Sequence, residues 1–160
     1  MYVDALLALS GSITGNTVTG QTVTGASNVI STNTVDLSSN GTPSGQVRDI
    51  GAGEFTYGRF EVVTAFTGLT ALEMQVITAD DAALTTNVRV VGTTGAIAVA
   101  SLTAGARFVC DVNPIIGSKG QRYIGARYVP TGTGTAGALY GDVGPDYEDA
   151  KYYPSGFAVL

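Results

Sequence analysis

Hydrophobic residues in this chain fall in short runs, which are separated by glycine together with threonine, serine, asparagine or aspartate. The breaks recur about every 8 to 15 residues, and the runs between them are rich in Val, Thr, Tyr, Phe and Ile. This spacing is typical of a sandwich or barrel built from short strands. The predicted strands are Tyr2–Leu9, Thr34–Leu37, Arg59–Phe66, Leu72–Thr78, Asn87–Val91, Ile97–Leu102, Arg107–Val112, Arg122–Val129 and Ala138–Val143.

Several of these runs show the alternation of a half-buried strand. Every second residue is apolar in Leu72–Val76 and in Phe108–Val112, so each run has one apolar face. Bulky side chains occupy both faces of Arg122–Val129, as expected of a strand covered on both sides. The only helical candidate is a single turn at Asp80–Leu84, where an aspartate could cap it. We therefore predict an all-β fold.

The segment Ser12–Val29 departs from this pattern. Thr-Gly dipeptides begin at positions 14, 19 and 24, with Val18 and Val23 between them. Because side chains alternate along a strand, a five-residue step sends successive valines to opposite faces, which does not suit a continuous half-buried strand. The pattern predicts either a mobile loop with glycine turns or an extended arm that spans at most about 60 Å and reaches a neighbouring subunit.

Charged residues make up only 13% of the chain, against about 25% in an ordinary soluble domain. No apolar run is long enough to cross a bilayer. We therefore expect other protein subunits to cover much of the surface, which makes the chain a component of an assembly. Its 160 residues suit one domain, predicted as residues 1–160.

The net charge is −5, and there are only eight lysines and arginines. A nucleic-acid binder needs a basic surface for phosphates, and an anionic membrane attracts one, so neither is an expected partner. The apolar N-terminus is short and carries Asp4 where a signal peptide would be positively charged, which favours a first strand over a targeting segment.

The chain contains no histidine, which excludes Ser-His and Cys-His nucleophilic chemistry and imidazole metal sites. Its one cysteine, Cys110, cannot form an internal disulfide and lies in a predicted strand with no activating group nearby. We predict a buried and unreactive thiol. These observations favour a protein that is not an enzyme and holds no metal or cofactor.

Three other patterns hold weaker chemical signals. Gly132–Gly137 matches the G-x-G-x-x-G pattern of dinucleotide sites, but no helix follows it, so a hairpin loop is the better interpretation. Asp80-Asp81 resembles a carboxylate pair, although adjacent side chains point apart. The last pattern is the acidic cluster of Asp142, Asp146, Glu148 and Asp149. The spacing of these residues is not that of an EF-hand, so a solvated loop explains the cluster better than a calcium site.

Aromatic residues crowd into the last 14 residues of the chain: Tyr147, Tyr152, Tyr153 and Phe157. Tyrosine buries a large amphipathic face at little cost in entropy and is enriched at protein interfaces. Two interpretations stay open, because the same rings could instead close one end of the hydrophobic core.

The order of several motifs resembles that of a known family. The residues that carry the likeness are Met1–Leu7, Ser31–Leu37, Arg48–Glu54, Gln75–Leu84, Gly95–Arg107, Arg122–Tyr128 and Tyr153–Phe157. In this order they resemble the tailed-phage capsid cement proteins of the Bordetella-phage (Bbp16-like) type. The Thr-Gly steps look like an insertion relative to that family.

The resemblance implies a jelly-roll-type β-sandwich of short antiparallel strands with long loops. It also implies a decoration protein on the outer surface of an expanded icosahedral capsid, located on the virion and made in the host bacterial cytoplasm. The expected partners are the major capsid protein of an HK97-type shell and a second copy of the chain, in a homodimer or another homo-oligomer. The residues predicted at partner interfaces are Tyr2, Val18, Val23, Tyr147, Tyr152, Tyr153 and Phe157.

The alternative function is a carbohydrate-binding β-sandwich on a virion or cell surface. Such a module needs exposed aromatic platforms, and the chain has no tryptophan, although tyrosine could replace it. A hydrolytic enzyme is the least favoured class because histidine is absent.

Overall fold

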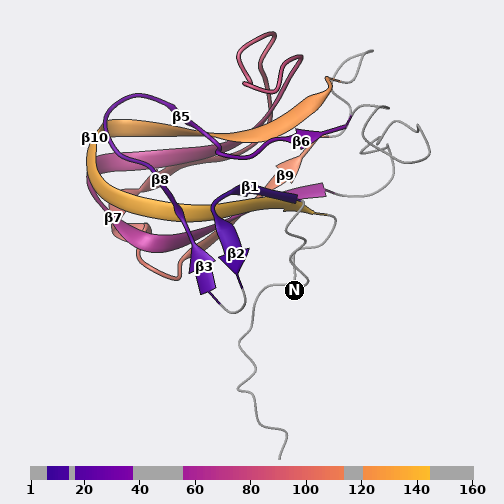
Figure 1. The fold of residues 1–160 in the computed structure, drawn as a ribbon. Helices are drawn as coiled ribbons and strands as arrows, with labels where there is room; N and C mark the ends of the chain where they lie inside the picture. The colour runs from indigo at the N-terminus through magenta and orange to yellow at the C-terminus, as the bar shows by residue number, and fades with distance from the viewer. Residues whose placement is uncertain (1–6, 15–16, 38–55, 114–120, 145–160) are drawn as a thin grey trace, which may run out of the picture.

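Two long strands run antiparallel and side by side through the molecule (Figure 1): β7 (Thr56–Ala79) and β10 (Tyr123–Gly144). The computed structural model describes residues 7–14, 17–37, 56–113 and 121–144. The other elements in these ranges are β1 (Ala8–Ser10), β2 (Ser12–Thr14), β3 (Thr17–Thr19), β4 (Gln21–Thr22), β5 (Val29–Ile30), β6 (Val35–Asp36), β8 (Arg89–Ala98), β9 (Arg107–Val112) and a short 3₁₀ helix, η3 (Val99–Ser101). Across these same ranges, no helix is long and apolar enough to cross a membrane.

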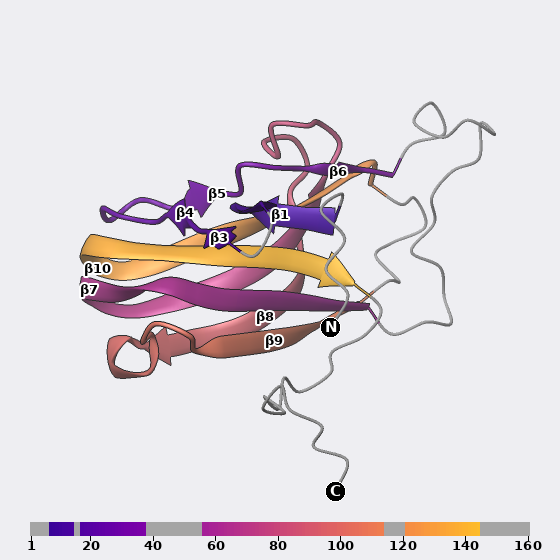
Figure 2. The same cartoon turned by 60° about the horizontal axis from the view of Figure 1, so that its bottom comes forward.

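Each long strand contributes to two layers of a curled antiparallel sheet. The start of β7 pairs with β9 and its end pairs with β8, while β10 lies along its other side throughout. The end of β10 pairs with β1 and β4, and its start pairs with β5 and β6. The first layer therefore holds β9, the start of β7, the end of β10, β1 and β4. The second layer holds β8, the end of β7, the start of β10, β5 and β6 (Figure 2).

Glycines allow the two long strands to pass from one layer to the other. Gly68 in β7 and Gly132 in β10 have positive φ angles of 85° and 89°, which are strained for a residue with a side chain. The register between β7 and β10 shifts in this region, as it does at β-bulges. The segment Gly132–Gly137 is therefore a bend inside β10, and the predicted hairpin loop is wrong.

The hydrophobic core lies between the two layers. Phe60 on β7 and Tyr128 on β10 meet edge to face, with ring centroids 6.0 Å apart. The Tyr128 hydroxyl lies 2.5 Å from the hydroxyl of Ser10 on β1, so a buried polar contact joins the layers. Burial raises the pKa of Tyr128. Leu72 and Leu139 are also fully buried in this core, which confirms that the alternation in the sequence marks inward-facing positions.

Side chains and backbone groups close the layers along their edges. On one side Gln21 bridges to the second layer, because its Nε2 donates to the Ile30 carbonyl (2.7 Å) and its Oε1 accepts from the Thr32 N–H (2.9 Å). On the other side the Asn113 N–H donates to the carbonyl of Val91 (2.8 Å), which joins the end of β9 to β8. These bonds satisfy edge groups that would otherwise invite another strand.

The predicted all-β sandwich is confirmed, with longer strands than the sequence suggested. The predicted pair Arg59–Phe66 and Leu72–Thr78 forms the single strand β7, and the pair Arg122–Val129 and Ala138–Val143 forms β10. The predicted strand Ile97–Leu102 is wrong, because β8 ends at Ala98 and η3 follows. Strand β9 has the predicted bounds.

The segment Ser12–Val29 contains short paired strands, which neither the predicted loop nor the predicted extended arm included. It contains the β2–β3 hairpin and then β4, which pairs with β10. A bridge between Gly25 and Gly134 continues this pairing. Together, β1, β4, β5 and β6 form one interrupted edge strand that lies along β10. Each of the four short strands pairs with the backbone of β10.

Candidate interaction surfaces

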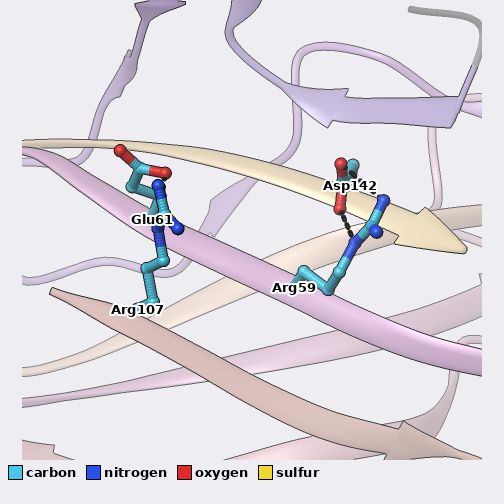
Figure 3. Close-up of polar contacts among 4 residues, drawn as sticks. All are labelled: Arg59, Glu61, Arg107 and Asp142. Carbon is cyan, nitrogen blue, oxygen red and sulfur yellow. Dashed lines mark hydrogen bonds and ion pairs between the residues drawn. The ribbon is translucent and has the colours of Figure 1, made fainter. Parts of the chain in front are cut away.

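A ladder of charged residues lies on the outer face of the first layer, made by Arg59, Glu61, Arg107 and Asp142 (Figure 3). Arg59 and Glu61 are two residues apart on β7 and so share one face. Arg59 lies opposite Asp142 of β10, and Glu61 lies opposite Arg107 of β9. Strand register therefore places each charge beside an opposite one.

The Arg59–Asp142 pair is bidentate and buried. Its distances are 2.6 Å from Nε to Oδ1 and 2.8 Å from Nη2 to Oδ2, and the side chains are 13% and 1% exposed. Burial raises the pKa of the Asp142 carboxyl, and the Arg59 guanidinium opposes that rise. Arg107 Nε lies 3.0 Å from Glu61 Oε2 in a more exposed pair. The Arg59–Asp142 pair joins β7 to β10, and the Glu61–Arg107 pair joins β7 to β9. The ladder therefore links three neighbouring strands of the first layer.

The outer face of the second layer has a polar row of its own. Glu73 Oε1 accepts from the Gln75 amide (2.7 Å) and from the Thr93 hydroxyl (2.7 Å), and Arg127 Nε donates to Gln75 Oε1 (2.8 Å). The bonds from Gln75 and Thr93 lower the pKa of Glu73. The charges of this row are therefore bonded within the chain.

The two adjacent aspartates shape the loop that follows β7. The Asp81 carboxylate accepts from the backbone N–H groups of Thr85 (2.9 Å) and Thr86 (2.6 Å), and these bonds, led by the one from Thr86, lower its pKa. Asp80 accepts from the side-chain amide of Asn87 (2.6 Å). Each carboxylate is thus bonded within the loop, which agrees with a structural role for the pair.

The remaining chemical candidates have defined places. Cys110 is buried, and burial raises the pKa of its thiol to about 11, as the predicted unreactive cysteine requires. Both carboxylate oxygens of Asp142 face Arg59, and the rest of the acidic cluster lies outside the described residues. Over residues 7–14, 17–37, 56–113 and 121–144, no three His, Cys, Asp or Glu side chains gather as a metal site would require.

Few of the exposed side chains in the described ranges are charged. Exposed positions in the described ranges are mostly Thr, Ala, Ser, Gly and Asn. The charged residues among them are Asp80, Arg89, Arg107, Asp111 and Arg122. Hydroxyl groups and small apolar side chains therefore dominate the face that the molecule shows to its surroundings.

The predicted interface residues separate into three groups. Val18 is half-buried on β3, where a partner could reach it. Val23 is 1% exposed and belongs to the core, so its assignment to an interface is wrong: β4 turns it inward against β10. The others lie outside the described residues, and they are Tyr2, Tyr147, Tyr152, Tyr153 and Phe157.

The sequence pattern does not reveal the Arg59–Asp142 and Arg107–Glu61 ion pairs or the bridging role of Gln21. The partners in each pair are far apart in the chain, and the sequence separation of Arg59 and Asp142 is 83 residues. Alternation on Arg59–Phe66 places Arg59 and Glu61 on one face, but it does not reveal which strands lie beside them.

Comparison with known proteins supports the likeness found in the sequence. A model of the Bbp16 family matches residues 17–143, a region that runs from β3 almost to the end of β10. A search of curated proteins finds no match. The family match covers most of the chain and includes both long strands and the two layers that they build. The chain therefore belongs to the Bbp16 family, a bacteriophage-related family.

Proposed function

We propose that this chain is a capsid decoration protein. It binds the outer surface of the expanded icosahedral capsid and bridges neighbouring subunits of an HK97-type major capsid protein. The observation that carries the proposal is membership of the Bbp16 family, which suggests a phage-related structural protein. The proposal places the chain on the virion after synthesis in the host cytoplasm and gives it no enzymatic activity, cofactor, nucleic-acid partner or membrane partner.

The surface of the sandwich suits such a role. Charged residues are depleted at the centres of protein interfaces, because burying an unpaired charge is costly. Here the buried charge of Asp142 is already matched by Arg59, and Glu61 is matched by Arg107. The exposed Thr, Ala and Ser residues can pack against a shell without desolvating ions.

Stabilisation of the shell follows from mass action. A ligand that binds only the expanded shell shifts the equilibrium toward it, against disassembly and against the outward pressure of packaged DNA. Each bridging copy holds two subunits, and icosahedral symmetry repeats the contact many times. Modest affinity for each site is therefore sufficient.

The test is co-sedimentation of the purified chain with empty expanded shells, with unexpanded shells as the control. We expect saturable binding to expanded shells alone and a raised shell disruption temperature, because the ligand binds only one state. Binding to neither shell, or equal binding to both, would contradict the proposal.

Two variants identify the face that docks. Val109→Glu places a long acid beside Arg59 on the outer face of the first layer, and Ala96→Lys places a long base beside Glu73 on that of the second. Both positions are exposed and next to an opposite charge, so folding should be preserved. Loss of shell binding in one variant and not in the other assigns the docking face.

A further inference from the structure

The β2–β3 hairpin forms a two-stranded sheet separate from the main sheet. Its register pairs Ser12 with Thr19, Ile13 with Val18 and Thr14 with Thr17. Across the described ranges, no hydrogen bond joins these two strands to another element. In Figure 1 the arrows of β2 and β3 extend below the body of the sandwich.

The hairpin is inserted into the edge strand at one point. Gly11 has a positive φ of 76°, and a Cβ atom there would collide with the carbonyl of Thr19 and lie 3.2 Å from Gly20 Cα. The chain therefore leaves the sandwich at Gly11 and returns beside it at Gly20. Strands β1 and β4, on either side of the insertion, both pair with β10.

A two-stranded ribbon is marginally stable in water when nothing packs against it. Ile13 and Val18 are β-branched and half-buried, yet neither belongs to a hydrophobic core cluster of the sandwich. In a hairpin with a two-residue connection, the two residues that flank the connection form backbone hydrogen bonds with each other. The next pair along the strands is not hydrogen-bonded to each other, so its N–H and C=O groups point away from the partner strand. Ile13 and Val18 are that next pair, and both edges of the ribbon therefore present backbone donors and acceptors.

No charged residue lies between Asp4 and Asp36, a stretch that contains the whole hairpin. Natural proteins guard free strand edges with charges, lysine above all, or with proline, and the hairpin has neither. Residues close to a two-fold axis lie near their own copies, so like charges there would repel and an uncharged ribbon would not. The chain as a whole has a net charge of −5, and residues 12–19 contain no charged side chain.

We propose that the β2–β3 hairpin is a self-association element. It pairs edge to edge with the same hairpin of a second copy around a two-fold axis, which builds a four-stranded sheet across the interface. A second copy fits best because both ribbons have the same length, the same unpaired backbone groups and no charge. The association takes place in solution and does not depend on shell binding; strand β2 precedes the region matched by the family model.

The first test is sedimentation velocity over a range of protein concentrations. Thr14→Lys with Thr17→Lys adds two exposed cations to each ribbon, while Ala83→Lys with Ala104→Lys adds the same charge at exposed positions elsewhere. We expect a dimer for the wild type and the control, and at least about a tenfold higher Kd for the hairpin variant. A monomeric wild type, or an equal Kd for the two variants, would overturn the proposal.

The second test removes the hairpin by joining Gly11 directly to Gly20, which deletes residues 12–19. We expect a monomer that melts like the wild type, since the deletion leaves β1 and β4 on β10. If this variant stays dimeric, the proposal fails.

The third test is disulfide cross-linking through Ile13→Cys or Val18→Cys, where Cys110 is too buried to interfere. A disulfide needs Cα atoms within about 7 Å, so a linked dimer from either variant places the ribbons side by side. No cross-link from either variant would overturn the proposal. If the wild type is monomeric and the lysine variant loses only shell binding, the hairpin contacts the shell protein and the second copy is the wrong partner.

Discussion

Leu84 shows how a single residue combines strain with burial. Its φ of 57° lies in the left-handed region, which costs a residue with a Cβ about 1–2 kcal/mol. The side chain is 2% exposed, lies directly over Gly125, and forms a small second cluster with Ile77 and Ala79 on the outer face of the second layer. Burial of this side chain holds the loop after β7 against the sheet despite the strain.

Replacement of Leu84 separates these two effects. Leu84→Ala should lower the free energy of unfolding by about 2–5 kcal/mol through lost packing. Leu84→Gly should be at least as stable as Leu84→Ala, because glycine adopts positive φ without strain. Urea denaturation measures both. Leu72 in β7 provides the control, because its φ is ordinary, and there Leu72→Gly should be less stable than Leu72→Ala. If Leu84→Gly is also less stable than Leu84→Ala, the role of strain is contradicted.

At the scale of elements, the edge of the sandwich depends on side chains that replace missing strand partners. Strands β4 and β5 each contain two residues and pair with β10 on one side only. Gln21 satisfies a carbonyl and an N–H along the edge of the second layer and links the two short strands. The Gln21 amide therefore protects this edge from pairing with another strand, as charged residues or proline do at many other strand edges.

Gln21→Ala should weaken this edge. Loss of the bonds to Ile30 and Thr32 should lower the free energy of unfolding by about 1–2 kcal/mol and raise the rate of aggregation. Denaturant unfolding and light scattering measure the two effects. Thr22→Ala changes the exposed neighbour on the same strand and should stay within about 0.5 kcal/mol of the wild type. Equal stability of the two variants would show that the Gln21 bonds add nothing.

At the scale of the whole molecule, low surface charge sets the character of its contacts. The Arg59–Asp142 and Arg107–Glu61 pairs are internal to the first layer, and the Glu73 row is bonded within the second. The rest of the described surface is mainly hydroxyl and small apolar groups. Contacts made by such a surface depend on packing and hydrogen bonds more than on long-range attraction.

Binding to expanded shells should therefore change little with salt. Between low salt and about 0.5 M salt, where exposed charges are screened, the Kd should vary by less than about threefold. Co-sedimentation at several salt concentrations measures this. A variant that adds exposed charge, Ala83→Lys with Ala104→Lys, provides the comparison. A steep loss of wild-type binding in salt would show that charged residues dominate the interface.

Local patterns in the sequence predicted the inward-facing positions well. Leu72–Val76 and Phe108–Val112 alternate as the structure does, because the period of a strand is visible within a few residues. The same reasoning excluded a continuous half-buried strand at Ser12–Val29, as the structure confirms, but it did not predict the short strands found there. The step spans a hairpin and the start of a new strand, so no single alternation runs through it.

The sequence by itself determined the strand class, the inward positions and the scarcity of surface charge, because each follows from residue type or from neighbours along the chain. Only the tertiary structure decided that β7 and β10 continue through their glycines, that Val23 is core and that Asp142 faces Arg59. These features depend on pairing between distant segments, such as Ser10 with Tyr128 at a separation of 118 residues. Backbone hydrogen bonding fixes such pairings through the register of whole strands, and no local pattern encodes that register.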